Sequence, residues 1–290
     1  MILVQALKQS AHILSLNGIE DSHIEARMLL GHITNLSPVQ IYTQTERALS
    51  REQEVSLQEL VARRLGHEPA AYIVKRREFY GTDFYVDSRV LIPRPETEIL
   101  IDTALEFARS TGNRSTRPLT IADVGTGCGA IAICLALNLP RSKIYATDVS
   151  FSALEVARLN CDYHKVTDRV TLLQGNLLEP LPAPIDLLVA NLPYIKSSDL
   201  ANLSSEIIKF EPRLAIDGGE SGLDYIHQLL EQAGGRINPE SCLLLEIGQN
   251  QEKEVSRLIQ SCLDKVNFEF ISDLNGIKRA ARLNFECAPI

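Results

Sequence analysis

The sequence predicts an α/β protein in which a doubly wound, mostly parallel sheet follows a small all-helical domain. From Leu119 onward, strand-like and helix-like segments alternate, and such alternation implies parallel strands with helices on both faces of the sheet. Residues 1–75 instead carry apolar side chains at helical spacing, with few strand signals. The last two strand-like segments are joined only by Ser272 to Arg279, which is too short for a helical crossover. We therefore expect an antiparallel hairpin at the edge of the sheet.

The helices of the N-terminal part can be placed from their ends. Asn17-Gly18 has the composition of a helix stop, and Asp21 or Ser22 can cap the next helix. Ser50 and Gln53 have the spacing of a capping box in front of a longer helix. These signals predict a helical bundle.

The segment that follows has a different character. Phe79-Tyr80-Gly81 and Phe84-Tyr85-Val86 are aromatic and β-branched with a glycine between them, which predicts a hairpin. Pro93 and Pro95 then enforce an extended backbone, and Pro95 can open the helix after it. We expect three parts, which are a helical bundle at 1–75, a hairpin and linker at 76–98, and a sheet domain at 99–290.

Seven segments of the third part have strand character. They are residues 121–124, 144–146, 170–173, 185–190, 242–247, 268–271 and 280–285. Helical segments are expected between them at 131–137, 151–159, 223–233 and 251–263.

Net charge, cysteine spacing and the length of apolar runs exclude several classes of function. The chain has 290 residues and a net charge of −8, and an acidic surface disfavours nonspecific binding to duplex DNA, so we expect no direct nucleic-acid partner. The six cysteines show no C-x-x-C spacing and no neighbouring His pair, so we expect reduced thiols and no metal. The first residues lack the pattern of a signal peptide and no apolar run reaches the length of a membrane span. We expect a cytoplasmic monomer that does not bind membranes.

A glycine-rich turn lies between the first predicted strand and the helix after it. Its glycines allow a tight backbone turn and close approach of a ligand, and the N-terminus of the following helix presents free N–H groups. An acidic residue, Asp148, ends the next strand, where it can bond the two hydroxyls of a ribose. The candidate nucleoside-binding residues are Asp123, Gly125, Thr126, Gly127, Cys128, Gly129 and Asp148.

The identity of the nucleoside depends on Asp123. Gly125, Gly127 and Ala130 satisfy the permissive dinucleotide pattern, so a nicotinamide-dependent oxidoreductase has to be considered. A carboxylate beside the turn disfavours a pyrophosphate but favours a ligand with an ammonium group. S-adenosylmethionine has an ammonium and a sulfonium, so Asp123 favours it. After the third strand, Asn176 can bond the edge of an adenine and Leu177 can pack on its face, although a turn asparagine explains Asn176 equally well.

The fourth predicted strand ends in Asn191-Leu192-Pro193-Tyr194, where a parallel strand opens into a binding crevice. The Asn191 side-chain oxygen and the Leu192 carbonyl form a pair of acceptors that suits a planar –NH2 group. Asn191 is also a candidate cofactor-binding residue. Pro193 and Tyr194 can form the walls of this site. The alternative is an ordinary strand exit with a turn asparagine.

Taken together, the glycine turn, Asp148 and Asn191-Leu192-Pro193-Tyr194 resemble those of class I S-adenosylmethionine-dependent methyltransferases. More narrowly, the chain resembles the peptide chain release factor N5-glutamine methyltransferases, the HemK/PrmC family. Further matching segments cover most of residues 65–250. They are Pro69–Ile73, Phe79–Gly81, Leu91–Glu98, Glu211–Arg213, Gly218-Gly219, Gly222-Leu223 and Leu244–Gly248.

This resemblance implies transfer of a methyl group to the glutamine of a Gly-Gly-Gln motif in class I release factors. Asn191 and Leu192 would then accept the two amide N–H groups of that glutamine, and the helical bundle would choose the protein partner. The family usually has proline where this chain has Leu192. Any residue supplies a carbonyl, but leucine is less stiff than proline, so we expect a looser turn.

Four rival interpretations stay open on the sequence. A glutamine methyltransferase that acts on a ribosomal protein would share the core motifs. An adenine-N6 methyltransferase of DNA or RNA uses the same type of turn but calls for a basic face. An NAD-dependent oxidoreductase leaves Asn191–Tyr194 unexplained, and a non-catalytic binding module would follow if Leu192 disabled the site.

Overall fold

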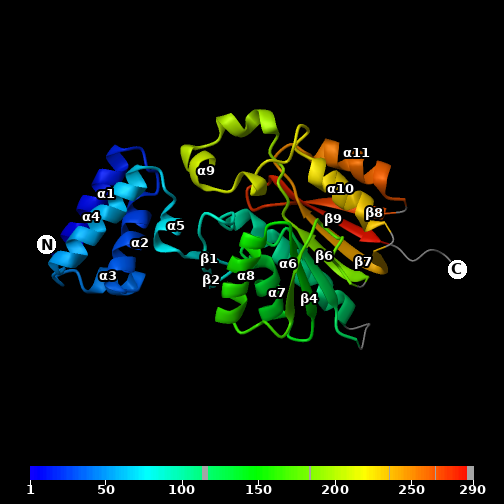
Figure 1. Ribbon diagram of the computed structural model, residues 1–290, viewed down its shortest axis with the longest axis horizontal. Helices are drawn as coiled ribbons and strands as arrows, with labels where there is room; N and C mark the ends of the chain where they lie inside the picture. Colours follow the sequence, from blue (N-terminus) through cyan, green and yellow to red (C-terminus); the bar gives the residue numbers. More distant parts are fainter. Residues whose placement is uncertain (113–116, 183, 235, 265, 286–290) are drawn as a thin grey trace. The chain divides into compact units, whose positions relative to one another are not determined.

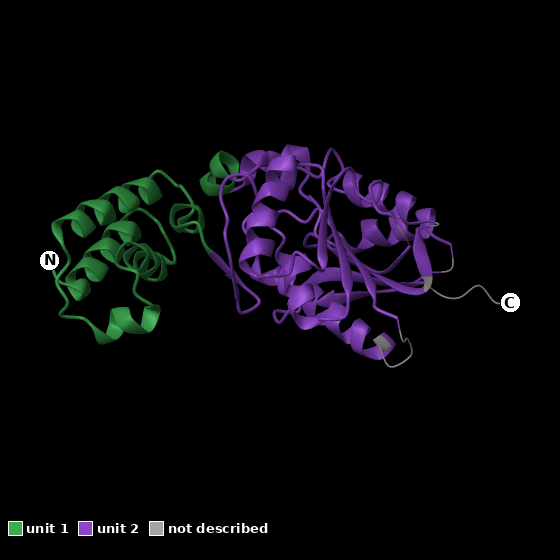
Figure 2. Cartoon of the chain, turned by 60° about the horizontal axis from the view of Figure 1, so that its bottom comes forward, with its two compact units in different colours: residues 1–76, 204–210 green, residues 77–203, 211–290 purple. Residues whose placement is uncertain are grey.

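The computed structural model describes residues 1–112, 117–182, 184–234, 236–264 and 266–285, and these form two compact units (Figure 2). The first unit contains residues 1–76 and 204–210, and the second contains residues 77–203 and 211–290 apart from those gaps. None of the helices in the described ranges is both long and apolar enough to cross a membrane.

The first unit is the predicted helical bundle. Its core consists of leucine, isoleucine, valine and alanine side chains from successive helices, among them Leu3, Leu14, Leu29 and Leu57. The helices of the bundle are α1 (Leu3–Leu16), α2 (Ser22–Thr34), α3 (Pro38–Thr43), α4 (Arg51–Leu65) and α5 (Ala70–Val74) (Figure 1).

The helix ends follow the sequence signals closely. α1 ends before Asn17, and Gly18 adopts a φ of 78°, which a glycine reaches without strain. Ser50 and Gln53 form the predicted capping box, in which each side-chain oxygen accepts the other residue's backbone N–H. Asp21 precedes α2 but its side chain makes no capping bond.

A short helix from the middle of the chain completes this unit. α9 (Ser205–Phe210) belongs to it by compactness. Arg64, whose side chain is 3% exposed, pairs with Glu25 and with Glu206 of α9. No local pattern predicts this return of the chain, because the contact joins residues 142 positions apart.

The second unit begins with the predicted hairpin. β1 (Arg77–Phe79) and β2 (Thr82–Phe84) pair antiparallel around Tyr80 and Gly81, which both have positive φ. Positive φ at both central residues is the geometry of the type I′ hairpin turn. As predicted, Pro95 opens the next helical segment, the 3-10 turn η1 (Pro95–Thr97), which leads into α6 (Glu98–Gly112).

The sheet has seven strands in the order β5-β4-β3-β6-β7-β9-β8. The first five in this order are parallel, and β9 pairs antiparallel with both β7 and β8. The predicted hairpin therefore exists, with its first strand at the sheet edge. The strands are β3 (Thr120–Val124), β4 (Lys143–Asp148), β5 (Val170–Gln174), β6 (Ile185–Ala190), β7 (Ile237–Glu246), β8 (Val266–Ser272) and β9 (Lys278–Phe285).

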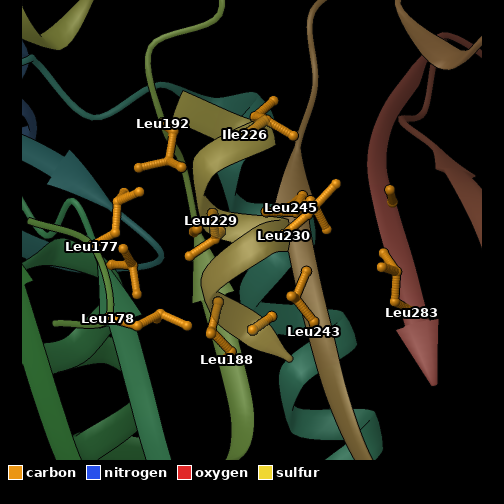
Figure 3. Close-up of a cluster of buried hydrophobic side chains, with 14 of the residues drawn as sticks. Leu177, Leu178, Leu188, Leu192, Ile226, Leu229, Leu230, Leu243, Leu245 and Leu283 are labelled. Carbon is orange, nitrogen blue, oxygen red and sulfur yellow. The ribbon is translucent and has the colours of Figure 1, made fainter. Parts of the chain in front are cut away.

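Helices cover both faces of the sheet, which confirms the doubly wound prediction (Figure 1). α6, α7 (Ala130–Asn138) and α8 (Phe151–Tyr163) lie on one side, and α10 (Asp224–Ala233) and α11 (Glu252–Cys262) lie on the other. Alternate strand residues such as Leu188 and Leu243 pack against α10 and α11 in one apolar cluster (Figure 3). β6 is buried along its whole length, as expected of a central parallel strand.

The long connection from β6 to α10 contains η2 (Ser197–Asn202), α9 and η3 (Arg213–Ala215). The sequence predicts no regular structure here, because each element is at most six residues long. Such short pieces show no helical period.

Candidate active site

A cavity of the second unit lies at the carboxyl ends of four neighbouring strands. Residues directly after β3, β4, β5 and β6 line it, at the point where the strand order changes direction. Open parallel sheets bind ligands at such a point. The lining residues are Arg89, Val90, Leu91, Gly125, Gly127, Thr147, Asp148, Val149, Ser150, Ala153, Gly175, Asn176, Leu177, Asn191, Leu192, Pro193, Pro212, Leu214, Ala215 and Tyr225.

The glycine turn has the conformation that its residue types indicate. Gly125, Gly127 and Gly129 have φ values of 73°, 55° and 84°, which L-residues with side chains rarely adopt. Gly125 and Gly127 line the cavity. Gly129 instead permits helix packing, since a Cβ there would lie 3.3 Å from the Cβ of Ala157 on α8. The three glycines thus serve two purposes.

Asp123 lies beneath this turn and is 1% exposed. Its Oδ2 accepts hydrogen bonds from the Thr126 hydroxyl at 2.6 Å and from the Ala132 N–H at 3.0 Å. Its Oδ1 is buried and finds no hydrogen-bond partner among the described residues. Burial raises the pKa of Asp123 to about 7. An orphaned carboxylate oxygen of this kind fits a ligand that brings an ammonium group.

Asp148 ends β4 and lines the cavity. Its Oδ2 accepts from the Gly127 N–H at 2.9 Å, and its Oδ1 accepts from the Ser150 N–H at 2.9 Å. Burial raises its pKa. A carboxylate has about four lone-pair positions, so these two bonds fix its orientation and leave acceptor capacity for ribose hydroxyls.

Asn176 and Leu177 follow β5 and line the same cavity. The Asn176 amide donates to Glu179, which fits a turn role as well as a ligand role. Leu177 has a φ of 50°, which is uncommon for a residue with a branched side chain, and its carbonyl accepts from the Thr147 hydroxyl at 2.9 Å. Backbone strain at a residue that lines a cavity indicates a function at that position.

Five of the predicted site residues do not line the cavity in the described structure. Thr126 and Cys128 are buried under the turn, where Thr126 bonds Asp123 and the Cys128 carbonyl accepts from Asn160. The five are Asp123, Thr126, Cys128, Gly129 and Tyr194. Each of them is close in the sequence to a residue that lines the cavity, so they support the lining residues.

The Asn191–Tyr194 turn is enclosed by glycines. A Cβ on Gly218 would lie 2.7 Å from the Pro193 carbonyl oxygen, and one on Gly222 would lie 2.8 Å from the Tyr194 carbonyl oxygen. Contacts this short do not occur between real atoms of these types. Gly218 and Gly222 are therefore required for the chain to pass beside the turn, a role that the sequence alone did not reveal.

Hydrogen bonds from distant residues hold the same turn. The Asn191 Nδ2 donates to the Thr97 hydroxyl at 3.0 Å, and this hydroxyl donates to the Glu246 Oε2 at 2.6 Å. The Tyr194 hydroxyl donates to the other oxygen of Glu246 at 3.2 Å. Gln251 adds a bond from its Nε2 to the Tyr194 carbonyl at 2.8 Å. The sequence placed Thr97 and Glu246 in matching segments but gave them no role.

Leu192 is restrained by its side chain. The side chain is 4% exposed and belongs to the apolar cluster of the sheet (Figure 3). A Cβ on Gly125 would lie 3.0 Å from its Cδ2. The packing against Gly125 joins the glycine turn to the Asn191–Tyr194 turn and supplies a restraint that proline would supply through its ring.

Another part of the cavity wall is tied to the proline-rich segment. The Glu211 carboxylate, which is buried, pairs with Arg94 and accepts from the Ile92 N–H at 3.3 Å. Pro212, directly after Glu211, lines the cavity, as does Leu91. The Arg94–Glu211 pair thus fastens two of the segments that form this wall. Among the described residues no cluster of His, Cys, Asp and Glu side chains has the geometry of a metal site.

Comparison with solved structures supports the fold. A crystal structure of a methyltransferase from Pyrococcus furiosus aligns with a TM-score of 0.51 at 16% identity, over 72% of this chain and 91% of that one. The hMettl16 catalytic domain, solved in complex with the MAT2A 3'UTR hairpin 6, aligns with a TM-score of 0.54 at 16% identity, over 72% and 77%. At such identity the likeness concerns the fold only.

Comparison at the level of sequence is more specific. Residues 5–74 match the PrmC N-terminal domain, and residues 113–223 match the methyltransferase small domain. The release factor glutamine methyltransferase of Chlorobaculum tepidum is 36% identical over 96% of this chain and 95% of its own length. That of Moorella thermoacetica is 39% identical over 96% and 97%. The chain therefore belongs to the release factor glutamine methyltransferase family.

Proposed function

We propose that this protein transfers a methyl group from S-adenosylmethionine to the side-chain amide nitrogen of the glutamine in the Gly-Gly-Gln motif of class I release factors. Family membership over nearly the whole chain supports the reaction class and the substrate. The observation that carries the chemistry is the orientation of Asn191, whose Nδ2 is engaged by Thr97 inside the protein. The acceptor Oδ1 is then the atom left to meet a substrate at the cavity.

Residues that line the cavity or lie beneath the glycine turn fit S-adenosylmethionine in chemical type. Asp123 brings a buried carboxylate oxygen for an ammonium, and Asp148 brings acceptor capacity for ribose hydroxyls. Leu177 brings an apolar surface for the adenine ring. When bound, the cofactor supplies an already activated sulfonium methyl group. We assign these three side chains, with the glycine turn and Asn176, to cofactor binding.

The protein's task in this reaction is orientation. A primary amide nitrogen is a weak nucleophile because its lone pair is delocalised into the carbonyl. Two acceptors, Asn191 Oδ1 and the Leu192 carbonyl, hold the –NH2 group in line with the methyl and increase electron density on the nitrogen. Positioning of reactants can contribute about 7 to 11 kcal/mol to lowering a barrier. The clamp also discriminates against glutamate, which would leave both acceptors unpaired.

The helical bundle is the part that we assign to recognition of the release factor. It is a separate compact unit with its own core, so it can present a surface without altering the cavity. We expect the reaction to take place in the cytoplasm.

The test is transfer of a tritiated methyl group to a purified class I release factor. We expect label in the wild-type factor and none in a factor whose Gly-Gly-Gln glutamine is replaced by glutamate. Purified DNA, RNA and ribosomes serve as alternative acceptors. Label in nucleic acid or in a ribosomal protein, with none in the release factor, would exclude the proposed substrate.

A further inference from the structure

We propose that Thr97 and Glu246 form a hydrogen-bond relay that holds the Asn191 amide with Oδ1 toward the substrate, and that the ionised state of Glu246 sets its direction. The inference rests on the proposed function, since it concerns the acceptor of the amide clamp. It assigns positioning roles to two residues that are 94 and 55 positions away from Asn191 in the sequence.

The relay is buried, so water cannot replace its members. Thr97 is 4% exposed and Glu246 is 3% exposed. Thr97 comes from the 3-10 turn that opens α6, and Glu246 is the last residue of β7. The first element precedes the Asn191–Tyr194 turn in the sequence and the second follows it, and both bond the turn.

The direction of the relay follows from counting hydrogens. An ionised carboxylate only accepts, so the single hydrogen of the Thr97 hydroxyl is donated to Glu246 at 2.6 Å. The hydroxyl then has only lone pairs to offer Asn191, which must turn its Nδ2 toward Thr97. Since the amide is planar, its Oδ1 is held on the opposite side. One buried negative charge therefore decides which end of the asparagine amide is available to the substrate.

Protonation of Glu246 reverses this logic. The carboxylic acid can donate its own proton to the Thr97 oxygen, and the Thr97 hydrogen is released toward Asn191. The amide then presents Oδ1 to Thr97 and its –NH2 to the cavity. Two –NH2 groups would face each other there, and the clamp would lose an acceptor.

The surroundings of Glu246 place this change in an accessible pH range. Burial, with a smaller effect of Glu96, raises the pKa of Glu246 to about 7, although hydrogen bonds from the Thr97 and Tyr194 hydroxyls and the charge of Arg279 oppose the shift. Burial and the charge of Glu246 raise the pKa of Tyr194 well above its usual value, so its hydroxyl remains a donor. The relay is in its productive direction above about pH 7 and is lost below it.

The test is the kcat of three single variants with a release factor as substrate. Thr97→Val keeps the shape but leaves Asn191 Nδ2 without an acceptor, and we expect kcat to fall by about 100-fold. Thr97→Ser keeps the hydroxyl and should restore kcat. Thr103→Val is the matched control, because Thr103 is another buried threonine of the same helical region, and its hydroxyl donates to the Ile99 carbonyl of its own helix. It should have the wild-type kcat.

The pH profile separates positioning from folding. Wild-type kcat should fall as pH decreases through about 7, whereas the low kcat of Thr97→Val should not change over this range. Affinity for S-adenosylmethionine should be the same in all variants, because the Thr97 hydroxyl bonds Asn191 and Glu246 and not the acids or glycines assigned to the cofactor. The relay would be refuted if Thr97→Val had the wild-type kcat, or if its kcat fell below about pH 7 in the same way as that of the wild type. Absence of methyl transfer in the wild type would instead refute the proposed function.

Discussion

Two turns meet in the cavity, and they are held in place in different ways. The glycine turn is held by bonds over shorter separations in the sequence. Asp123 bonds residues three and nine positions further along the chain, Asp148 bonds Gly127 at a separation of 21 residues, and Asn160 bonds the Cys128 carbonyl at a separation of 32 residues. The Asn191–Tyr194 turn is fixed by Thr97 and Glu246, at separations of 94 and 52 residues. The proposed cofactor turn thus depends on contacts of shorter range than those that hold the proposed substrate turn. The two sides should respond differently to mutation.

The strongest separation is expected from Asn191→Ala. This change removes the side-chain acceptor of the amide clamp, and loss of one such group in an active site costs about 100- to 1,000-fold in kcat. The measurement is single-turnover methyl transfer to a release factor. Calorimetric titration with S-adenosylmethionine should give nearly the wild-type affinity. If methyl transfer persists, or if cofactor binding is lost together with it, the two sides are not separable and the comparison fails.

The next effect concerns the glycines that enclose the substrate turn. Gly218→Ala would bring a Cβ to 2.7 Å from the Pro193 carbonyl oxygen, so the turn has to move. A displacement of about 1 Å in a reacting group can cost about 100-fold in rate. We expect a loss of that order in kcat, with cofactor affinity unchanged.

Gly234→Ala is the matched control for Gly218. The nearest atom to a Cβ at Gly234 is 3.8 Å away, which is an ordinary contact. This variant should retain wild-type kcat. Equal activity in both variants would show that the turn does not need the close approach at Gly218.

A smaller effect is expected on the cofactor side. The pKa of Asp123 is raised to about 7 by burial, and an ammonium group binds its ionised form. Affinity for S-adenosylmethionine should therefore increase as pH rises through about 7. At pH 8, Asp123→Asn should weaken the binding of S-adenosylmethionine by about tenfold, which is the free energy that corresponds to one pKa unit. The variant should also lose the pH dependence of binding. Titrations at several pH values measure both.

The same carboxylate makes a separate prediction for stability. Its folded-state pKa exceeds its unfolded value of 3.8, so its contribution to stability is present at low pH and is lost as pH rises toward 7. The cofactor-free Asp123→Asn protein should therefore unfold at a higher temperature than the wild type at pH 8. A lower unfolding temperature for the variant would contradict the burial of an unpaired charge.

The smallest effect is expected for Leu192→Pro. The backbone carbonyl is retained, so methyl transfer should stay within about threefold of the wild type, which is less than 1 kcal/mol in the barrier. Stability should decrease by about 1 kcal/mol because Leu192 is 4% exposed and packs in the core. Parallel kcat measurements and urea unfolding report the two quantities. A large change in kcat would show that the substrate turn depends on the leucine side chain itself.

The sequence predicted the fold because its signals are periodic and local. The strand at residues 185–190 is predicted and observed with the same bounds, since a mostly apolar run of six residues, all of them buried, has a clear pattern. The capping box of Ser50 and the type I′ turn at Gly81 are equally local. α9 was missed because its six residues have no helical period of their own.

The features of the site also differ in whether local sequence or long-range contacts decide them. The sequence by itself determined the fold class, the position of the glycine turn, the acids at the strand ends and the family, because these depend on residue types within a few positions of each other. Only the tertiary structure decided that the Asn191 amide donates to Thr97 and which glycines allow the chain to pass the turn. Those features depend on contacts between residues dozens of positions apart, and a hydrogen bond or a steric clearance exists only once the sheet has brought them together.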